Sequence, residues 1–211
     1  MSSDVCLCVF ARAPVPGKVK TRLQTLLSPQ AACDVHQQLM EACLAKMQHG
    51  NWRHQLWSTD SRNQIINDLS QHYHFEMQLQ IGADLGERMH HAIRTAALMQ
   101  RYIVVIGTDC PVISVEYINQ ALEKLQSAPV VLGPAEDGGY VLLAIDSQAI
   151  ETNQIKNLFS NIPWGGKQVF ATTCQRLTDS GCSWEQLERL WDVDNPDDYQ
   201  RWQQLKTTAV S

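Results

Sequence analysis

The chain has 211 residues, of which 44% are hydrophobic and 18% charged, and its formal net charge is -5. These values are typical of a folded globular protein, and the negative charge argues against nucleic acid as a general partner. No apolar run approaches the roughly 18 residues that a membrane span needs, and no signal-like segment opens the sequence, so we expect a cytoplasmic protein without a membrane span.

The seven cysteines form no C-x-x-C pair and lie mostly in apolar or helical contexts. This usage predicts reduced core residues rather than a disulfide framework or a metal cluster. No linker-like or low-complexity stretch interrupts the chain, so residues 1–211 are expected to form a single domain.

A rigid basic loop follows the first apolar run. Residues 5–10 have the length and composition of a buried strand, and Pro14 and Pro16 make the next segment stiff and non-helical. Three cations then alternate with other residues, and in an extended segment they would point the same way, which suits a polyphosphate. The alternative is a solvated basic turn. The three cations are Lys18, Lys20 and Arg22.

The remaining elements alternate between strand and helix patterns. Ser28 and Pro29 form a helix start, and apolar residues keep a helical period up to Gly50. The run 102–106 is almost wholly apolar, as expected for a central strand covered on both faces. We predict further strands at 55–59, 75–81, 130–132, 140–145 and 187–191, and further helices at 63–72, 85–100, 115–126, 166–177 and 196–205.

This alternation predicts an α/β fold with a mostly parallel, doubly wound sheet flanked by helices. Ligands in such sheets bind outside the carboxyl ends of the strands. The basic loop and the polar segments 82–88 and 107–111 each follow a predicted strand. We therefore expect these loops to converge on one rim of the sheet.

Two acids on this rim are candidate metal ligands. Asp109 follows the most apolar strand in a turn ended by Pro111, and one carboxylate beside a phosphate loop suffices for Mg²⁺. Asp194 belongs to an acidic segment before a proline-opened helix and is a candidate second ligand. Turn or helix capping is the alternative for each: Asp109 could cap a turn, and Asp194 or Asn195 could cap the helix at Pro196.

Two further polar segments have both functional and structural interpretations. Asp137 precedes paired glycines, which would let backbone approach a ligand closely but also suits an ordinary hairpin turn. The segment 84–88 could offer helix amides to an anion or a base edge, or merely cap its helix. Common phosphate, dinucleotide, zinc-protease and serine-hydrolase motifs are absent, and the histidine spacing makes a zinc site improbable.

Five segments together resemble the GT-A-like nucleotide-diphospho-sugar transferase superfamily and, within it, the DUF2064 group. The KTRL stretch is also similar to part of the phospholactate guanylyltransferases, and the acidic tail to that of nucleotidyltransferases. The segments are FARAPVPGKVKTRL (10–23), DLGERM (84–89), GTDCP (107–111), GPAEDGGY (133–140) and DVDNPDD (192–198).

The resemblance implies a role for each segment. The first would hold nucleotide phosphates through Arg12, Gly17, Lys18, Lys20 and Arg22, and the second would face the nucleoside through Asp84, Gly86, Glu87 and Arg88. It further implies that Asp109 and Asp194 bind Mg²⁺ or Mn²⁺, that Asp137, Gly138 and Gly139 face the acceptor or sugar, and that Lys20, Arg22, Asp109 and Asp137 serve catalysis. One departure is that two prolines and only Gly17 stand where many nucleotidyltransferases have a glycine-rich loop.

The implied function is nucleotidyl transfer from a nucleoside triphosphate to a small phosphorylated acceptor, with release of pyrophosphate. One alternative is a glycosyltransferase that uses a nucleotide-sugar donor, with Asp137 as the base. The other is a nucleotide-binding regulator without turnover. The base, sugar and acceptor are not encoded in these motifs.

Overall fold

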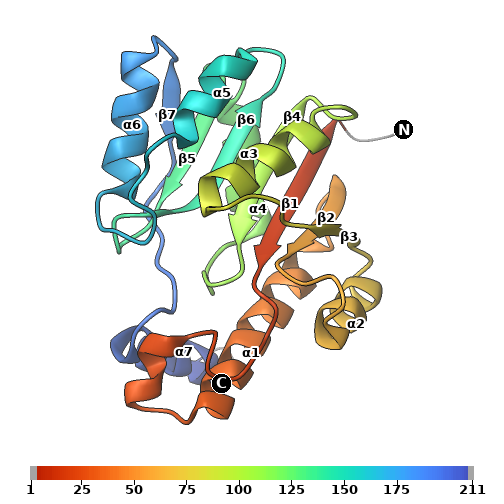
Figure 1. The fold of residues 1–211 in the computed structure, drawn as a ribbon, viewed down its shortest axis with the longest axis vertical. Helices are drawn as coiled ribbons and strands as arrows, with labels where there is room; N and C mark the ends of the chain where they lie inside the picture. Colours follow the sequence, from red (N-terminus) through yellow and green to blue (C-terminus); the bar gives the residue numbers. More distant parts are fainter. Residues whose placement is uncertain (1–3, 209–211) are drawn as a thin grey trace.

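A computed structural model, which describes residues 4–208, shows one seven-stranded sheet between two layers of helices (Figure 1). The strand order is β3-β2-β1-β4-β6-β5-β7, and only β6 runs antiparallel to its neighbours. The mostly parallel sheet expected from the sequence is therefore confirmed. The strands are β1 (Val5–Ala11), β2 (Arg53–Ser58), β3 (Glu76–Leu79), β4 (Tyr102–Gly107), β5 (Val130–Pro134), β6 (Tyr140–Asp146) and β7 (Trp184–Gln186).

Most helices begin where the sequence has a capping residue. Ser28, Asn63 and Ser114 each accept a hydrogen bond from the backbone N–H three residues later, as N-caps do. The helices are α1 (Pro29–Met47), α2 (Gln64–His72), α3 (Leu85–Ala96), α4 (Val115–Lys124), α5 (Thr152–Phe159), α6 (Val169–Asp179) and α7 (Pro196–Thr208), with a short 3₁₀ helix η1 (Thr21–Thr25).

Side-chain alternation along the strands divides the core into two faces. In β1, Leu7 and Val9 pack with residues of α1, α2 and α4, whereas Cys6 and Cys8 pack with residues of α3 and α5 on the other face. Successive strand residues point to opposite faces, so a strand covered by helices on both sides is apolar throughout. All four of these side chains are fully buried.

One predicted strand is wrong, and one helix was missed. Residues 187–191 do not form a strand: β7 ends at Gln186, and beyond it Leu190 only exchanges single backbone bonds with Pro134 and Glu136. Pro134 ends β5 and has no N–H to donate, so the ladder cannot continue there. The short helix α5 was not expected, and its residue Lys156 borders a cavity described below.

A third, smaller hydrophobic cluster lies beyond the carboxyl ends of the strands, where η1 and α7 pack against the start of α1 (Figure 1). This cluster, called here the edge cluster, fastens the basic loop to the C-terminal helix. Its buried members are Leu23, Ala32, Val35, Leu39, Trp191, Val193 and Trp202.

We expect Trp202→Ala to loosen the edge cluster. Trp202 is 4% exposed, and removing a buried aromatic side chain costs about 3–5 kcal/mol in the free energy of unfolding. Leu205→Ala, on the same helix but 42% exposed, is the control and should change stability by less than about 0.5 kcal/mol. Denaturant titration measures both, and equal stability of the two variants would contradict this role of α7.

Candidate active site

The basic loop begins with a tight turn that its sequence explains. Pro16 and Gly17 occupy the two central positions, Gly17 has φ +81°, and the N–H of Lys18 donates to the carbonyl of Val15 at 3.0 Å. Proline followed by a residue with positive φ is the pattern of a type II turn. The stiff loop predicted from Pro14 and Pro16 therefore starts as a defined turn.

The three cations of the loop do not point the same way, which corrects the expectation of an extended segment. The backbone turns at Lys20, which has a left-handed φ of +46°, and enters η1 at the next residue. As a result Lys18 and Arg22 are exposed while Lys20 is buried. A left-handed backbone is unusual for a residue other than glycine, and its cost of about 1–3 kcal/mol must be offset by the contacts of Lys20.

Those contacts form a bridge between distant parts of the chain. The Lys20 Nζ lies 2.8 Å from Asp109 Oδ1 and donates to the carbonyl oxygen of Val193 at 2.6 Å. The Val193 N–H in turn donates to the backbone carbonyl of Asp109 at 2.9 Å. We call these three groups the Lys20 bridge; it joins the basic loop, the turn after β4 and the segment before α7.

A second cation–carboxylate pair lies beside this bridge. Arg22 pairs with Asp194, and both side chains are at least a third exposed. The helix cap expected near Pro196 is Asn195, whose Oδ1 accepts the N–H groups of Asp197 and Asp198. Because Asn195 caps α7, the Asp194 carboxylate is free to face the basic loop.

The carboxylates of this region influence one another strongly. Burial acts to raise the pKa of Asp109, but the Lys20 ammonium and the His36 ring hold it well below its usual range. Burial, followed by the charges of Asp137 and Asp109, raises the pKa of Asp192 to about 7. Several carboxyl groups are therefore crowded at this rim, and Lys20 and Arg22 pair with two of them, Asp109 and Asp194.

His36 is a site residue that the sequence reasoning missed. It is buried in α1, its Nε2 lies 3.0 Å from the carbonyl oxygen of Arg12, and its Nδ1 is 3.7 Å from Asp109 Oδ1. A carbonyl oxygen only accepts, so Nε2 carries the proton. The only available signal was one polar residue on the buried face of an apolar helix. Asp192 was also missed as an individual residue, because the sequence shows it only as one member of the acidic segment 192–198.

The turn at Asp137 lies within electrostatic range of this centre, as its effect on Asp192 indicates. The Asp137 carboxylate is exposed and accepts the N–H of Gly139 at 2.7 Å, so the hairpin interpretation is structurally correct. Gly138 has φ +92°, and its backbone touches the loop that contains Lys167. This close approach explains a glycine here without any ligand.

The segment 84–88 lies at a different place on the same rim. Asp84 accepts the N–H of Glu87 at 2.8 Å, and Glu87 accepts that of Ala83, so both acids cap α3. Arg88 donates to the carbonyl of Gly82 at 3.1 Å. Among the described residues, no hydrogen bond or ion pair links this segment directly to the Lys20 bridge. Gln80 ties the preceding loop to the ends of β1 and β2 by donating to the carbonyls of Ala11 and Trp57.

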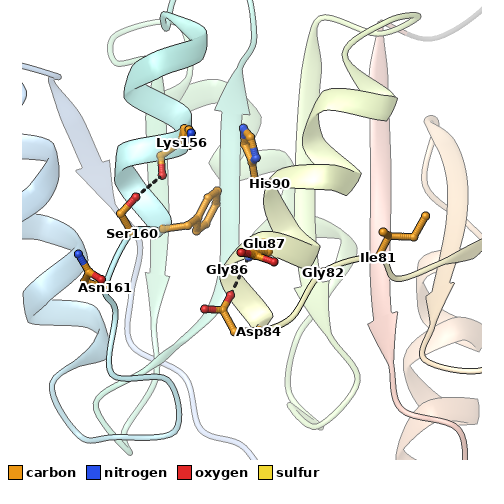
Figure 2. A pocket seen from close by; sticks show the side chains of 10 residues that line it. Ile81, Gly82, Asp84, Gly86, Glu87, His90, Lys156, Ser160 and Asn161 are labelled. Atoms are coloured by element: carbon orange, nitrogen blue, oxygen red, sulfur yellow. Dashed lines mark hydrogen bonds between the residues drawn. The ribbon is translucent and has the colours of Figure 1, made fainter.

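A cavity of about 580 Å³ separates the start of α3 from α5 (Figure 2). Burial and the nearby Arg94 and Lys156 lower the pKa of His90 at its wall. Gly86 is required there because a Cβ would lie 2.7 Å from the Trp164 ring and 2.9 Å from Phe159. The other residues that line the cavity include Ile81, Gly82, Asp84, Glu87, Ser160 and Asn161.

The residues at the Lys20 bridge have the chemistry of a cation and phosphate site. The described part of the chain contains no group of three or more His, Cys, Asp or Glu side chains that could by itself hold a metal ion. Mg²⁺ needs no such cage, since it binds one or two carboxylates together with phosphate oxygens and water. The Asp109 and Asp194 carboxylates, each beside a cation of the basic loop, fit that mode of binding.

Comparison with known sequences identifies a family. The profile described as "Uncharacterized protein conserved in bacteria (DUF2064)" matches residues 37–166. No curated protein matches the chain.

Comparison with solved structures supports the fold assignment. A Desulfovibrio desulfuricans G20 protein named as a nucleotide-diphospho-sugar transferase is 27% identical, with a TM-score of 0.82, over 92% of this chain and 83% of that one. A nucleotidyl transferase from Methanothermobacter thermautotroptrophicus is 14% identical, with a TM-score of 0.68, over 96% and 98%. A CMP:2-keto-3-deoxy-manno-octonic acid synthetase complexed with CTP is 13% identical, with a TM-score of 0.62, over 98% and 100%. At these last two identities the likeness shows the shared fold alone.

None of the helices in residues 4–208 has the length and apolarity that a membrane crossing requires. The seven cysteines are free thiols, and all but Cys174 are buried. The burial of the cysteines agrees with the core positions expected from the sequence.

We expect Gly138→Ala to disrupt the Asp137 turn. A Cβ would lie 2.0 Å from the carbonyl oxygen of Lys167 and would require an unfavourable positive φ, so stability should fall by about 2 kcal/mol or more. Gly165→Ala is the matched control, since it has φ +80° but no atom within 4 Å of the added Cβ. It should cost only about 1 kcal/mol. Thermal unfolding measures both, and an equal loss in the two variants would rule out the contact with Lys167.

Proposed function

The chain belongs to the DUF2064 family, and we propose that it is a Mg²⁺- or Mn²⁺-dependent transferase that moves a nucleotidyl group from a nucleoside triphosphate to a small phosphorylated acceptor. The observation that carries this proposal is the Lys20 bridge. It joins a basic loop to an acidic turn at the carboxyl edge of a doubly wound sheet, where such folds bind ligands. The names of the similar structures, nucleotidyl and nucleotide-sugar transferases, support the same reaction class.

The donor set fits a divalent cation that is bound together with phosphate. Asp109 and Asp194 would hold it, and the half-buried Asp192 is a further carboxyl group nearby. When bound, such an ion neutralises charge on the phosphate oxygens and on the leaving pyrophosphate. The buried His36 Nδ1, 3.7 Å from Asp109 Oδ1, adds a nitrogen to the polar groups around this carboxylate.

The side chains of the basic loop would bind and orient the triphosphate. Arg22 and Lys18 are exposed and can reach a ligand from solvent. Lys20 is buried and would bind a phosphate from the protein side of the site. In the reaction an acceptor phosphate oxygen forms a bond to the α-phosphorus, and the bond to the β-phosphate oxygen breaks, releasing pyrophosphate. The attacking oxygen already carries negative charge, so no general base is required, and catalysis is mostly positional and electrostatic.

Sugar transfer from a nucleotide sugar is the second candidate. The exposed carboxylate of Asp137, close enough to raise the pKa of Asp192, is the observation that favours it. There Asp137 would accept the proton of an acceptor hydroxyl as that oxygen bonds to the anomeric carbon, and the bond from this carbon to the phosphate oxygen would break, releasing the nucleoside diphosphate.

A pyrophosphate-release assay distinguishes these functions. Nucleoside triphosphates with phosphorylated acceptors and Mg²⁺ should yield pyrophosphate and a nucleotide-linked product. Consumption of nucleotide sugars without any pyrophosphate would overturn the leading proposal in favour of sugar transfer. Ligand-induced stabilisation without product from either donor would indicate a non-catalytic nucleotide-binding regulator.

We expect Arg22→Ala to weaken nucleotide binding about tenfold or more. A hydrogen bond to a charged group contributes about 1.5–3 kcal/mol, and 1.4 kcal/mol corresponds to a factor of ten. Arg62→Ala is the control, because Arg62 is an exposed cation whose ion-pair partner is Asp60, away from the basic loop. Calorimetric titration with a nucleoside triphosphate and Mg²⁺ measures the effect. Unchanged affinity in both Arg22→Ala and Lys20→Ala would reject the phosphate role of the loop.

We also expect Asp109→Ala to remove the dependence of nucleotide affinity on Mg²⁺. The measurement is a thermal-shift titration with and without the metal, and a full Mg²⁺ response in the variant would contradict the assignment of Asp109.

A further inference from the structure

Each cation–carboxylate pair at the rim joins one group proposed for phosphate to one group proposed for the metal. Lys20 is paired with Asp109, and Arg22 with Asp194. Lys18, on the same loop, is exposed, and the ion pairs found within residues 4–208 do not include it. In the ligand-free protein, the cations proposed to bind phosphate are therefore paired with the carboxylates proposed to bind the metal.

The Lys20 bridge is the stronger of the two pairs. The Lys20 side chain is 3% exposed, and its ammonium lies 2.8 Å from Asp109 Oδ1 while donating a hydrogen bond to the Val193 carbonyl. The Arg22 side chain is 63% exposed, so water and salt weaken its attraction to Asp194. Any competition between internal pairing and ligand binding is consequently concentrated at Lys20 and Asp109.

Binding only one ligand at this bridge would be opposed. Asp109 Oδ1 is buried next to Lys20, so an incoming divalent cation would bind the other oxygen of the same carboxylate, and the Lys20 ammonium, 2.8 Å from Oδ1, would repel it. A phosphate that drew Lys20 away would leave the Asp109 charge unpaired in a partly buried position. When both ligands are present, the metal pairs with Asp109 and the phosphate with Lys20, so each relieves the cost of the other.

We propose that the Lys20 bridge couples divalent-cation binding to phosphate binding, with Lys20 acting as an internal cation that keeps Asp109 occupied until both ligands arrive. This inference rests on the proposed function and deepens it. Coupling of this kind is reciprocal, so the metal must raise the affinity for phosphate by the same factor by which phosphate raises the affinity for the metal. The internal pairing of Lys20 with Asp109, which opposes each ligand, can be tested with either ligand alone.

The first test measures Mn²⁺ binding to the nucleotide-free protein by calorimetry and electron paramagnetic resonance. Lys20→Met removes the internal cation and should increase Mn²⁺ affinity at least tenfold. Lys18→Met is the matched control, because it removes the same charge from the same loop without freeing a carboxylate, and it should change affinity less than threefold. Arg22→Met should give a small increase.

The second test measures inorganic tripolyphosphate binding in EDTA, without any divalent cation. Asp109→Asn frees Lys20 and should increase tripolyphosphate affinity at least tenfold. Asp197→Asn is the charge-matched control, since Asp197 lies in the first turn of α7 and is exposed, and it should have little effect. This test decides the proposal even if Lys20→Met does not fold, as judged by circular dichroism.

Equal gains of Mn²⁺ affinity in Lys20→Met and Lys18→Met would overturn the coupling, because general charge would then explain both. So would an unchanged tripolyphosphate affinity in Asp109→Asn. Failure of the proposed function has a different signature: the affinity changes would occur as expected, but the wild-type protein would release no pyrophosphate from any nucleoside triphosphate.

Discussion

The organisation of this site depends on the Lys20 bridge, in which one buried ammonium pairs with the Asp109 carboxylate and donates to the Val193 carbonyl. It links residues that are up to 173 positions apart in the chain, and it lies where the basic loop leaves the sheet. An ammonium group buried to this degree requires such partners, because an unpaired buried charge would be strongly destabilising. The left-handed backbone of Lys20 is tolerated for the same reason, since it directs the side chain inward.

The edge cluster gives this polar bridge a hydrophobic support. Leu23 lies three residues after Lys20 in the sequence, and Val193 supplies the carbonyl of the Lys20 bridge. The side chains of both residues are fully buried in the cluster. Apolar packing is insensitive to direction, whereas the bridge is directional, so the cluster holds the loop in place and the bridge sets its register. A rigid Pro–Gly turn then replaces the flexible glycine-rich loop that many nucleotidyltransferases are expected to have at this position. Fewer backbone amides are available here, and the side-chain cations carry more of the proposed phosphate binding.

Much of the fold could be predicted from the sequence because its signals are local. Apolar runs, the helix start at Ser28 and Pro29 and the alternation of elements predicted most strands and helices and the mostly parallel sheet. The strand expected at 187–191 failed because strand formation there depends on a partner, and Pro134 cannot supply the next N–H. The local pattern of residues 187–191 cannot show this constraint, because it lies at Pro134, in another part of the chain.

The sequence predicted that the candidate site residues lie near one another, but not how they are arranged. Motif resemblance selected Lys20, Arg22, Asp109 and Asp194, and the structure brings these four together in two ion pairs. The alternating cations suggested a common direction, but the turn at Lys20 separates them, and a single left-handed residue is not visible in a charge pattern. His36 could not be found because its role depends on a tertiary contact with the basic loop.

A crystal structure with Mn²⁺ and a non-hydrolysable nucleoside triphosphate tests the central claim most directly. The account predicts that the Lys20 Nζ leaves Asp109 for a phosphate oxygen and that an anomalous-scattering peak for Mn²⁺ lies between the Asp109 and Asp194 carboxylates and the phosphates. A nucleotide bound away from the basic loop, with Lys20 still on Asp109 and Val193, would contradict it.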